Sequence, residues 1–208
     1  LRYIASLPGT ANDETYKVRD FRPLSGSYEK IVEIGEDQKS SVQIIFQGET
    51  EYDKSESKAM NVLGEILSIK LIEKLREEEG GVYGAGARGS ISKMPYGWYN
   101  FRISFPCGPE NVDKLTNAAL KELETIVKEG PTEIDLAKVK ESNLLEHKED
   151  LKTNRFWLSY LKNTDYSDRD SERVFEFEKG IESLTKEQIQ AVAKKYVSGG
   201  YILGVQNP

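Results

Sequence analysis

Two strong hydrogen-bond donors stand close together in the stretch KLREEEGGVYGAGARGS, which runs from Lys74 to Ser90. Arg76 belongs to a charged segment that ends at a pair of glycines, and Tyr83 follows seven positions after it. A guanidinium and a phenol can together hold a carbonyl oxygen or stabilise an oxyanion. Because Gly80 and Gly81 allow a sharp turn, we expect both side chains to converge on one site.

The two residues also have purely structural explanations. An arginine near the end of a helix interacts favourably with the helix dipole, and tyrosine is common in strands. The small residues after Tyr83, which run from Gly84 to Gly89, leave two alternatives open. Such a strand suits the close approach of a ligand or another backbone, or close packing of a helix over it.

Other candidates for chemistry are weaker. His147 is the single histidine, whereas a catalytic zinc is usually held by several protein ligands, histidines among them, so we predict no metal site in this chain. His147 lies in the polar stretch LLEHKEDLK, and we expect it to be a solvated helix residue. The consecutive acids Glu77, Glu78 and Glu79 point in different directions on a helix, which favours a solvated helix end over an acid/base pair.

Composition excludes two classes of function. The 208 residues are 38% hydrophobic and 31% charged, with a formal net charge of −6. A net negative chain argues against nucleic-acid binding, and long-range attraction would suit basic peptides. The longest apolar runs are a few residues, far below the roughly 20 of a membrane span, so we expect no membrane contact. The lone Cys107 forms no internal disulfide.

Hydrophobic periodicity predicts an α+β fold, with long helices covering a largely antiparallel sheet. An irregular connection over residues 9–29 is followed by these expected elements: strands 30–34, 40–48, 82–90, 98–106 and 199–208, and helices 55–79, 109–129, 132–161, one through Val174, Phe177 and Ile181, and 185–197 with a capping box of Thr185 and Gln188. We expect one domain over residues 1–208. The opening LRYIASLPGT is typical of a helix end, so we interpret the chain as a piece of a longer protein that lacks the domain's first strand and most of its first helix.

The segment from Met60 to Ser90 resembles the C-terminal domains of the insulinase/pitrilysin family of inverted-motif zinc metallopeptidases, most of all the large bacterial members. It contains the Leu-Arg helix end, the Gly-x-Tyr that follows and the seven-residue spacing. The likeness continues through FPCGPENVDKL, the helix of Trp157, DYSDRDSERV and SLTKEQIQAVAKKYV, and so covers nearly the whole chain. It implies a LuxS/metalloprotease-like fold.

The resemblance also implies a division of labour. Zinc, its H-x-x-E-H ligands and the general base would belong to the N-terminal domain of the parent chain, while this domain closes the cleavage chamber. Arg76 would bind a backbone oxygen of the peptide substrate, and Tyr83 would donate to the oxyanion. Gly84 and Ala85 would leave room for the peptide. The isolated fragment would then be inactive, and a periplasmic or cell-envelope location is implied, with the cytoplasm left open.

Two other functions compete with this interpretation. The chain could be a non-catalytic scaffold subunit or domain of the same fold, in a protein that has lost the zinc motif. It could also be a free-standing domain that binds a small ligand, although the clipped first helix disfavours this. An H-x-x-E-H motif several hundred residues upstream would decide for the peptidase.

Overall fold

The computed structural model describes residues 3, 6–9, 15, 17–19, 21–24, 26–35, 38–166 and 170–208. Its strands are β1 (Tyr28–Glu33), β2 (Ser40–Glu49), β3 (Gly86–Ser92), β4 (Trp98–Cys107) and β5 (Ile202–Asn207). Its helices are α1 (Lys54–Leu71), the π-helix η1 (Ile72–Glu78), the 3-10 helix η2 (Pro109–Asn111), α2 (Val112–Glu129), α3 (Glu133–Asp150), α4 (Asn154–Tyr166), the 3-10 helix η3 (Ser171–Glu176), α5 (Phe177–Glu182) and α6 (Lys186–Tyr196).

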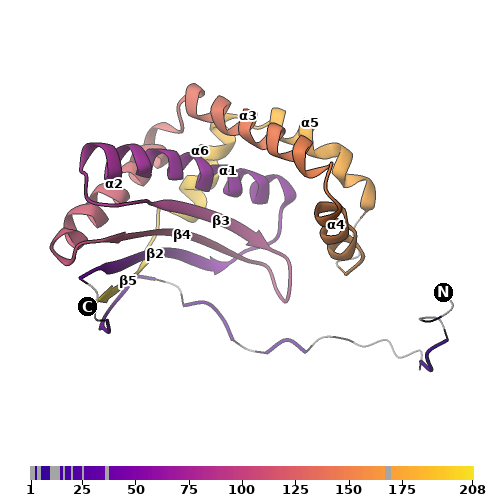
Figure 1. The fold of residues 1–208 in the computed structure, drawn as a ribbon, viewed down its shortest axis with the longest axis horizontal. Coiled ribbons are helices and arrows are strands. Elements are labelled where there is room, and N and C mark those ends of the chain that lie inside the picture. Colours follow the sequence, from indigo (N-terminus) through magenta and orange to yellow (C-terminus); the bar gives the residue numbers. More distant parts are fainter. Residues whose placement is uncertain are drawn as a thin grey trace.

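The five strands form one sheet in the order β1-β5-β2-β4-β3. β1 runs parallel to β5, and the other neighbouring pairs are antiparallel. The helices lie on one side of this sheet, and its other side carries no helix in the part of the chain that the structure describes (Figure 1). The predicted α+β class, with helices over a largely antiparallel sheet, is confirmed.

Alternation along the two central strands directs one set of side chains into the core. In β2 and β4 every second residue is buried, and Ile44 lies directly opposite Ile103 at full burial. Helix α1 adds the fully buried Leu63 and Leu67 from its apolar stripe. The core therefore fills the single space between the sheet and the helices. The other face of the sheet carries polar side chains together with apolar ones such as Ile45 and Ile202, which are paired with each other in the register.

Helix α1 packs unusually closely on the edge strand β3. A Cβ atom added to Gly89 would lie 2.5 Å from the Met60 carbonyl oxygen, and one added to Gly64 would lie 2.9 Å from the Gly89 nitrogen. Ser68 of α1 also contacts the backbone of β3: its Oγ accepts from the Ala87 N–H at 2.8 Å, and its single O–H lies within reach of the Gly64 carbonyl at 2.8 Å and the Ala87 carbonyl at 3.0 Å. The helix thereby replaces a neighbouring strand along part of the free edge of β3.

One long helix of the sequence prediction is wrong. The helix expected over 132–161 begins after the Thr132 cap as predicted, but it ends at Asp150, and α4 begins at Asn154. The Thr153 N–H donates to the Asp150 carbonyl at 2.8 Å, and the Thr153 hydroxyl accepts from the Phe156 N–H at 3.2 Å. This local bonding gives the chain an alternative to a continuous helix, because threonine side chains cap a new helix well.

Smaller differences concern the ends of the elements. The helix through Val174 opens as the 3-10 helix η3 before α5, and the helix expected from Pro109 opens as η2. The capping box of Thr185 and Gln188 at the start of α6 is confirmed, with both reciprocal bonds present. The expected helix end at residues 1–7 lies mostly outside the described residues. No helix of the described part is long and apolar enough to cross a membrane.

Candidate functional site

The site predicted around Arg76 begins where α1 changes into the π-helix η1. The Glu79 N–H donates to the Lys74 carbonyl at 3.1 Å, and the Gly81 N–H donates to the Leu75 carbonyl at 3.1 Å. Gly80 has a φ of 63°, the left-handed conformation that glycine adopts at low cost. The prediction that the glycine pair ends the helix and turns the chain is therefore confirmed.

Arg76 lies in this π-helical segment with an exposed side chain. Lysines take up two of the nearby carboxylates, since Lys74 pairs with Glu78 at 2.5 Å and Lys114 pairs with Glu79 at 2.7 Å. The hydrogen bond from Lys114 holds the pKa of Glu79 below its ordinary value. Within the described residues no acceptor holds the Arg76 guanidinium, so its donors face solvent.

Tyr83 is the second predicted donor, and its side chain is 92% exposed. It stands in the short bend between η1 and β3, where its neighbours Val82 and Ala85 pack against the core. The expected strand start at Val82 is wrong, because β3 begins only at Gly86. The reason is contact with α2: a Cβ atom at Gly81 would lie 2.8 Å from Leu115 Cδ1, so the chain here follows α2 before it joins β4.

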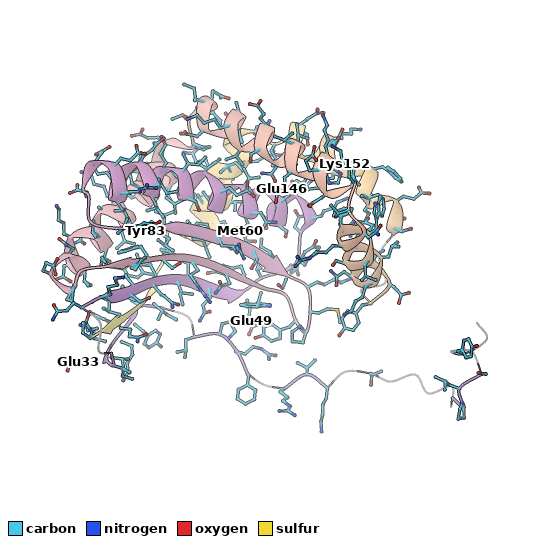
Figure 2. All side chains as sticks on the ribbon, in the orientation of Figure 1. Glu33, Glu49, Met60, Tyr83, Glu146 and Lys152 are labelled. Atoms are coloured by element: carbon cyan, nitrogen blue, oxygen red, sulfur yellow. The ribbon has the colours of Figure 1, made fainter. Side chains whose placement is uncertain are left out.

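Arg76 and Tyr83 thus lie on either side of one glycine turn. Figure 2 shows Tyr83 near the point where the chain enters β3. Neither the core nor a described polar group takes up either side chain. No hydrogen bond or cation–π contact joins the two in this structure. Both donors are open to solvent, and no described contact orients the two side chains toward a common point, so their expected convergence on one carbonyl oxygen or oxyanion stays a prediction.

The sequence left two explanations for the small residues near Tyr83, close packing of a helix or the close approach of a ligand. The structure supports a different one at different glycines. Close packing accounts for Gly89, which meets Met60, and for Gly81, which meets Leu115. It does not account for Gly84, because a Cβ atom there would have no atom within 4 Å. Gly84 and Ala85 are half-buried, and open space lies beside Gly84 next to the exposed phenol.

The sequence did not point to Ser68 and Leu115, two residues that position this region. Ser68 holds the first part of β3 through Ala87, and Leu115 holds the turn through Gly81. Neither gives a local signal, since a serine on a helix and a leucine in an apolar stripe are ordinary residues. Only the packing of α1 and α2 around the turn shows what they contact.

A charged contact secures the helices behind the turn. Lys70 of α1 lies 3.0 Å from the buried carboxylate of Asp135 in α3, and the Thr132 hydroxyl donates to the same carboxylate at 2.6 Å. Burial alone would raise the pKa of Asp135, but the hydrogen bonds from Thr132 and Lys70 outweigh it and hold that pKa below its ordinary value.

His147 is not the solvated residue expected from its polar surroundings. It is 7% exposed and stacks on Phe177 with ring centroids 4.2 Å apart, while Phe156 meets it edge-on at 5.9 Å. The break after α3 causes this, because α4 and α5 fold back over the end of α3. The described residues hold no group of three or more His, Cys, Asp and Glu side chains suited to a metal ion. A zinc centre therefore does not fit the described part of this chain.

Comparison with known proteins defines the class of this fold. A family model described as the peptidase M16 inactive domain matches residues 1–143. The curated "Zinc protease PQQL-like" of Arabidopsis thaliana is 31% identical over 106 residues, which are 48% of this chain and 11% of that protein. The chain thus spans about a tenth of that relative's length.

Solved structures show the same fold at low sequence identity. The periplasmic protease PqqL of Escherichia coli gives a TM-score of 0.75 at 18% identity, over 89% of this chain and 21% of that one. The peptidase M16 inactive domain from Pseudomonas fluorescens gives 0.77 at 17% identity, over 93% of this chain and 46% of that one. The chain belongs to the peptidase M16 inactive domain family, and the resemblance to a C-terminal domain of zinc metallopeptidases is confirmed.

Proposed function

We propose that this chain is the non-zinc-binding C-terminal domain of a zinc metalloendopeptidase, and that Arg76 and Tyr83 act on the peptide substrate. The whole of residues 1–208 forms one such domain in a longer parent chain. The zinc, its ligands and the general base lie in the N-terminal domain of the parent, which pairs with this domain around the cleavage chamber. Arg76 binds a backbone oxygen of the peptide, and Tyr83 donates a hydrogen bond to the developing oxyanion.

One observation carries the proposal: two strong donors remain unoccupied on the two sides of a rigid turn. Gly80 and Gly81 fix the turn, and the phenol is 92% exposed although Val82 beside it packs on the core. Exposure of a large aromatic side chain has no stabilising role of its own, because it leaves apolar surface in water. Open space beside Gly84 supports the approach of a peptide backbone.

The test replaces the phenol in the zinc-loaded, full-length parent. Tyr83→Phe removes the hydroxyl and leaves the ring, so we expect turnover to fall roughly 10- to 1,000-fold, the scale for loss of one oxyanion donor. The melting temperature should stay the same, because no described group bonds to the hydroxyl. Tyr166→Phe is the matched control, since Tyr166 is 76% exposed on α4.

Unchanged turnover in Tyr83→Phe would show that the phenol takes no part in hydrolysis. The chain would then fit the alternative of a non-catalytic scaffold domain. Equal losses in Tyr83→Phe and Tyr166→Phe would also contradict the proposal, because only Tyr83 lies at the turn.

A further inference from the structure

Two arginines lie directly opposite each other on the face of the sheet that carries no helix. Arg88 of β3 and Arg102 of β4 are paired in the antiparallel register, and both are exposed. Their chain neighbours Gly89, Phe101 and Ile103 are buried on the helix side. Because side chains alternate along a strand, both guanidinium groups leave the sheet on the helix-free side.

This pair is unfavourable on its own. Ser68 bonds the N–H and the carbonyl of Ala87, so those groups point away from β4, and the backbone groups of Arg88 point toward it. The Cα atoms of such a hydrogen-bonded pair are about 5.5 Å apart. Like charges directly opposite each other destabilise a sheet. No carboxylate among the described residues forms an ion pair with either arginine.

The strands of the helix-free side carry more basic than acidic side chains. Lys30 of β1 also lies on the helix-free side. Residues paired across neighbouring strands share one face of a sheet, and Lys30 is paired with Gly204 of β5. Gly204 is in turn paired with Gln43 of β2, and Gln43 with Ser104 of β4, two residues after Arg102. The one carboxylate of this side of β2, Glu49, lies 3.0 Å from Arg22 of the N-terminal segment. The surface therefore has excess positive charge, although the chain as a whole carries −6.

The remaining side chains of this surface are both apolar and polar, and Arg102 lies beside Ile45 of β2, which is paired with Ile202 of β5. Next to the arginines lie Ser90, Asn100 and Gln47, whose register places them side by side on β3, β4 and β2. Asn100 donates to Gln47 at 3.3 Å, and the Gln47 amide nitrogen donates to the Leu24 carbonyl oxygen at 3.3 Å, so the Asn100 carbonyl oxygen is the acceptor that a peptide backbone can still use. A single carboxylate can bridge two guanidinium groups, because each offers a planar fork of donors.

We propose that the helix-free face of the sheet, centred on Arg88 and Arg102, is a docking surface for an acidic stretch of the peptide substrate. Naming the occupant a substrate rests on the proposed function; the recognition of carboxylates does not. The surface begins beside Tyr83, since β3 starts three residues after it. The local charge thus favours acidic peptides, the opposite of what the net charge alone indicates.

The test measures equilibrium binding of labelled peptides to the chain by fluorescence anisotropy. The probes are a ten-residue peptide of alternating Glu and Ser, the same peptide with Gln for Glu, and the same peptide with Lys for Glu. We expect measurable affinity for the Glu peptide only, and we expect that affinity to fall as salt is raised, because exposed charges are screened.

Two double variants locate the site. Arg88→Gln with Arg102→Gln should weaken binding of the Glu peptide about 10-fold or more, the scale of one lost hydrogen bond to a charged group. Arg155→Gln with Lys162→Gln removes the same charge from exposed positions on α4 and should change the affinity less than about 2-fold. A circular dichroism spectrum of each variant checks that the fold is intact.

Three results would overturn the inference. These are equal binding of the Glu and Gln peptides, equal losses in the two double variants, and tighter binding of phosphatidylserine vesicles or single-stranded DNA than of the Glu peptide. The test is independent of cleavage. Tyr83→Phe could leave turnover of the parent unchanged while the arginine double variant binds the Glu peptide more weakly. In that case the proposed function would be contradicted and the docking surface would still be supported.

Discussion

At the scale of single residues, Arg76 and Tyr83 differ from most of the long polar side chains around them. Lys74 and Lys114 hold the carboxylates of Glu78 and Glu79 at 2.5 Å and 2.7 Å. Such surface pairs contribute little stability, but they occupy their donors. Arg76 and Tyr83 have no described partner, so their donors are available to a substrate without the loss of an existing bond.

Gly89 and Gly84 differ in packing, because a side chain at Gly89 would clash with α1 and one at Gly84 would not. Gly89→Ala should lower the free energy of unfolding by about 1–3 kcal/mol, because the new Cβ would lie 2.5 Å from the Met60 carbonyl oxygen and force α1 away from β3. A Cβ atom added at Gly84 has no other atom within 4 Å, so Gly84→Ala should leave the free energy of unfolding nearly unchanged.

In the parent enzyme Gly84→Ala should instead raise KM for the peptide, because the methyl group fills the space next to Tyr83.

Urea denaturation of both variants and steady-state kinetics of the Gly84→Ala parent check these expectations. A Gly89→Ala variant as stable as the natural chain would contradict the close packing of α1 on β3. An unchanged KM in Gly84→Ala would show that the peptide does not occupy the space beside Gly84.

At the scale of elements, the change from the α-helix α1 to the π-helix η1 places the Arg76 side chain on the solvent-exposed side of the helix. A π-helix has more residues per turn than an α-helix, so residues after Leu71 are rotated relative to the stripe that α1 buries. Leu75 still reaches the core at full burial, while Arg76 is left outside. Short π-helical segments inside α-helices are frequent at functional sites.

The contact between α1 and α3 should show a defined pH dependence. The lowered pKa of Asp135 stabilises the fold at pH values above the unfolded pKa of about 3.9, and this contribution is lost as the pH falls through the folded pKa. At pH 7, Asp135→Asn should cost about 2 kcal/mol of unfolding free energy, because it leaves Lys70 with a poorer partner. At about pH 3 the difference from the natural chain should be smaller.

Urea denaturation at the two pH values measures this difference. Glu141→Gln is the control, since Glu141 is exposed in the same helix. A penalty for Asp135→Asn that stays the same at pH 3 would show that charge is not what Asp135 contributes.

The sequence predicted some elements much better than others, for physical reasons. Strands β2 and β4 were predicted to within a residue, because one buried face imposes strict alternation on each. The start of β3 and the break between α3 and α4 were not predicted. The start of β3 depends on the tertiary contact between Gly81 and Leu115, which leaves no periodic signal. The break depends on the local hydrogen bonds of Thr153, which apolar periodicity does not register either.

The candidate site was predictable in its residues but not in its geometry. The spacing of Arg76 and Tyr83 around two glycines can be read from the chain, and the resemblance assigns them roles. That Tyr83 stands in a bend with open space beside Gly84 follows only from how α2 holds the turn. The roles of both donors stay predictions.

At the scale of the whole molecule, the described chain has a one-sided layout with its chemistry at the rim. Helices cover one face of the sheet (Figure 1). The strand register places the arginine pair on the other face, and Tyr83 comes three residues before β3. Such a half-covered domain suits a part that completes a site formed with another domain. In the proposed function, the zinc chemistry belongs to the N-terminal domain of the parent.

Metal analysis checks this division of labour. We expect the isolated 208-residue chain to bind no stoichiometric zinc after dialysis, to cleave no peptide, and to keep its melting temperature in the presence of EDTA. The reason is that His147 is enclosed by Phe156 and Phe177. One zinc per chain, or a melting temperature lowered by the chelator, would contradict the expectation.

The claim that two donors serve one reacting group is tested most directly by a double-mutant cycle on kcat/KM. The zinc-loaded parent is compared with Arg76→Gln, Tyr83→Phe and the double variant, with one peptide at saturating and limiting concentrations. Groups that act on one transition state are non-additive, so each single change should cost about 10-fold or more, and the double change clearly less than the product of the two. Effects that multiply without coupling, or single variants as active as the natural enzyme, would contradict the shared site.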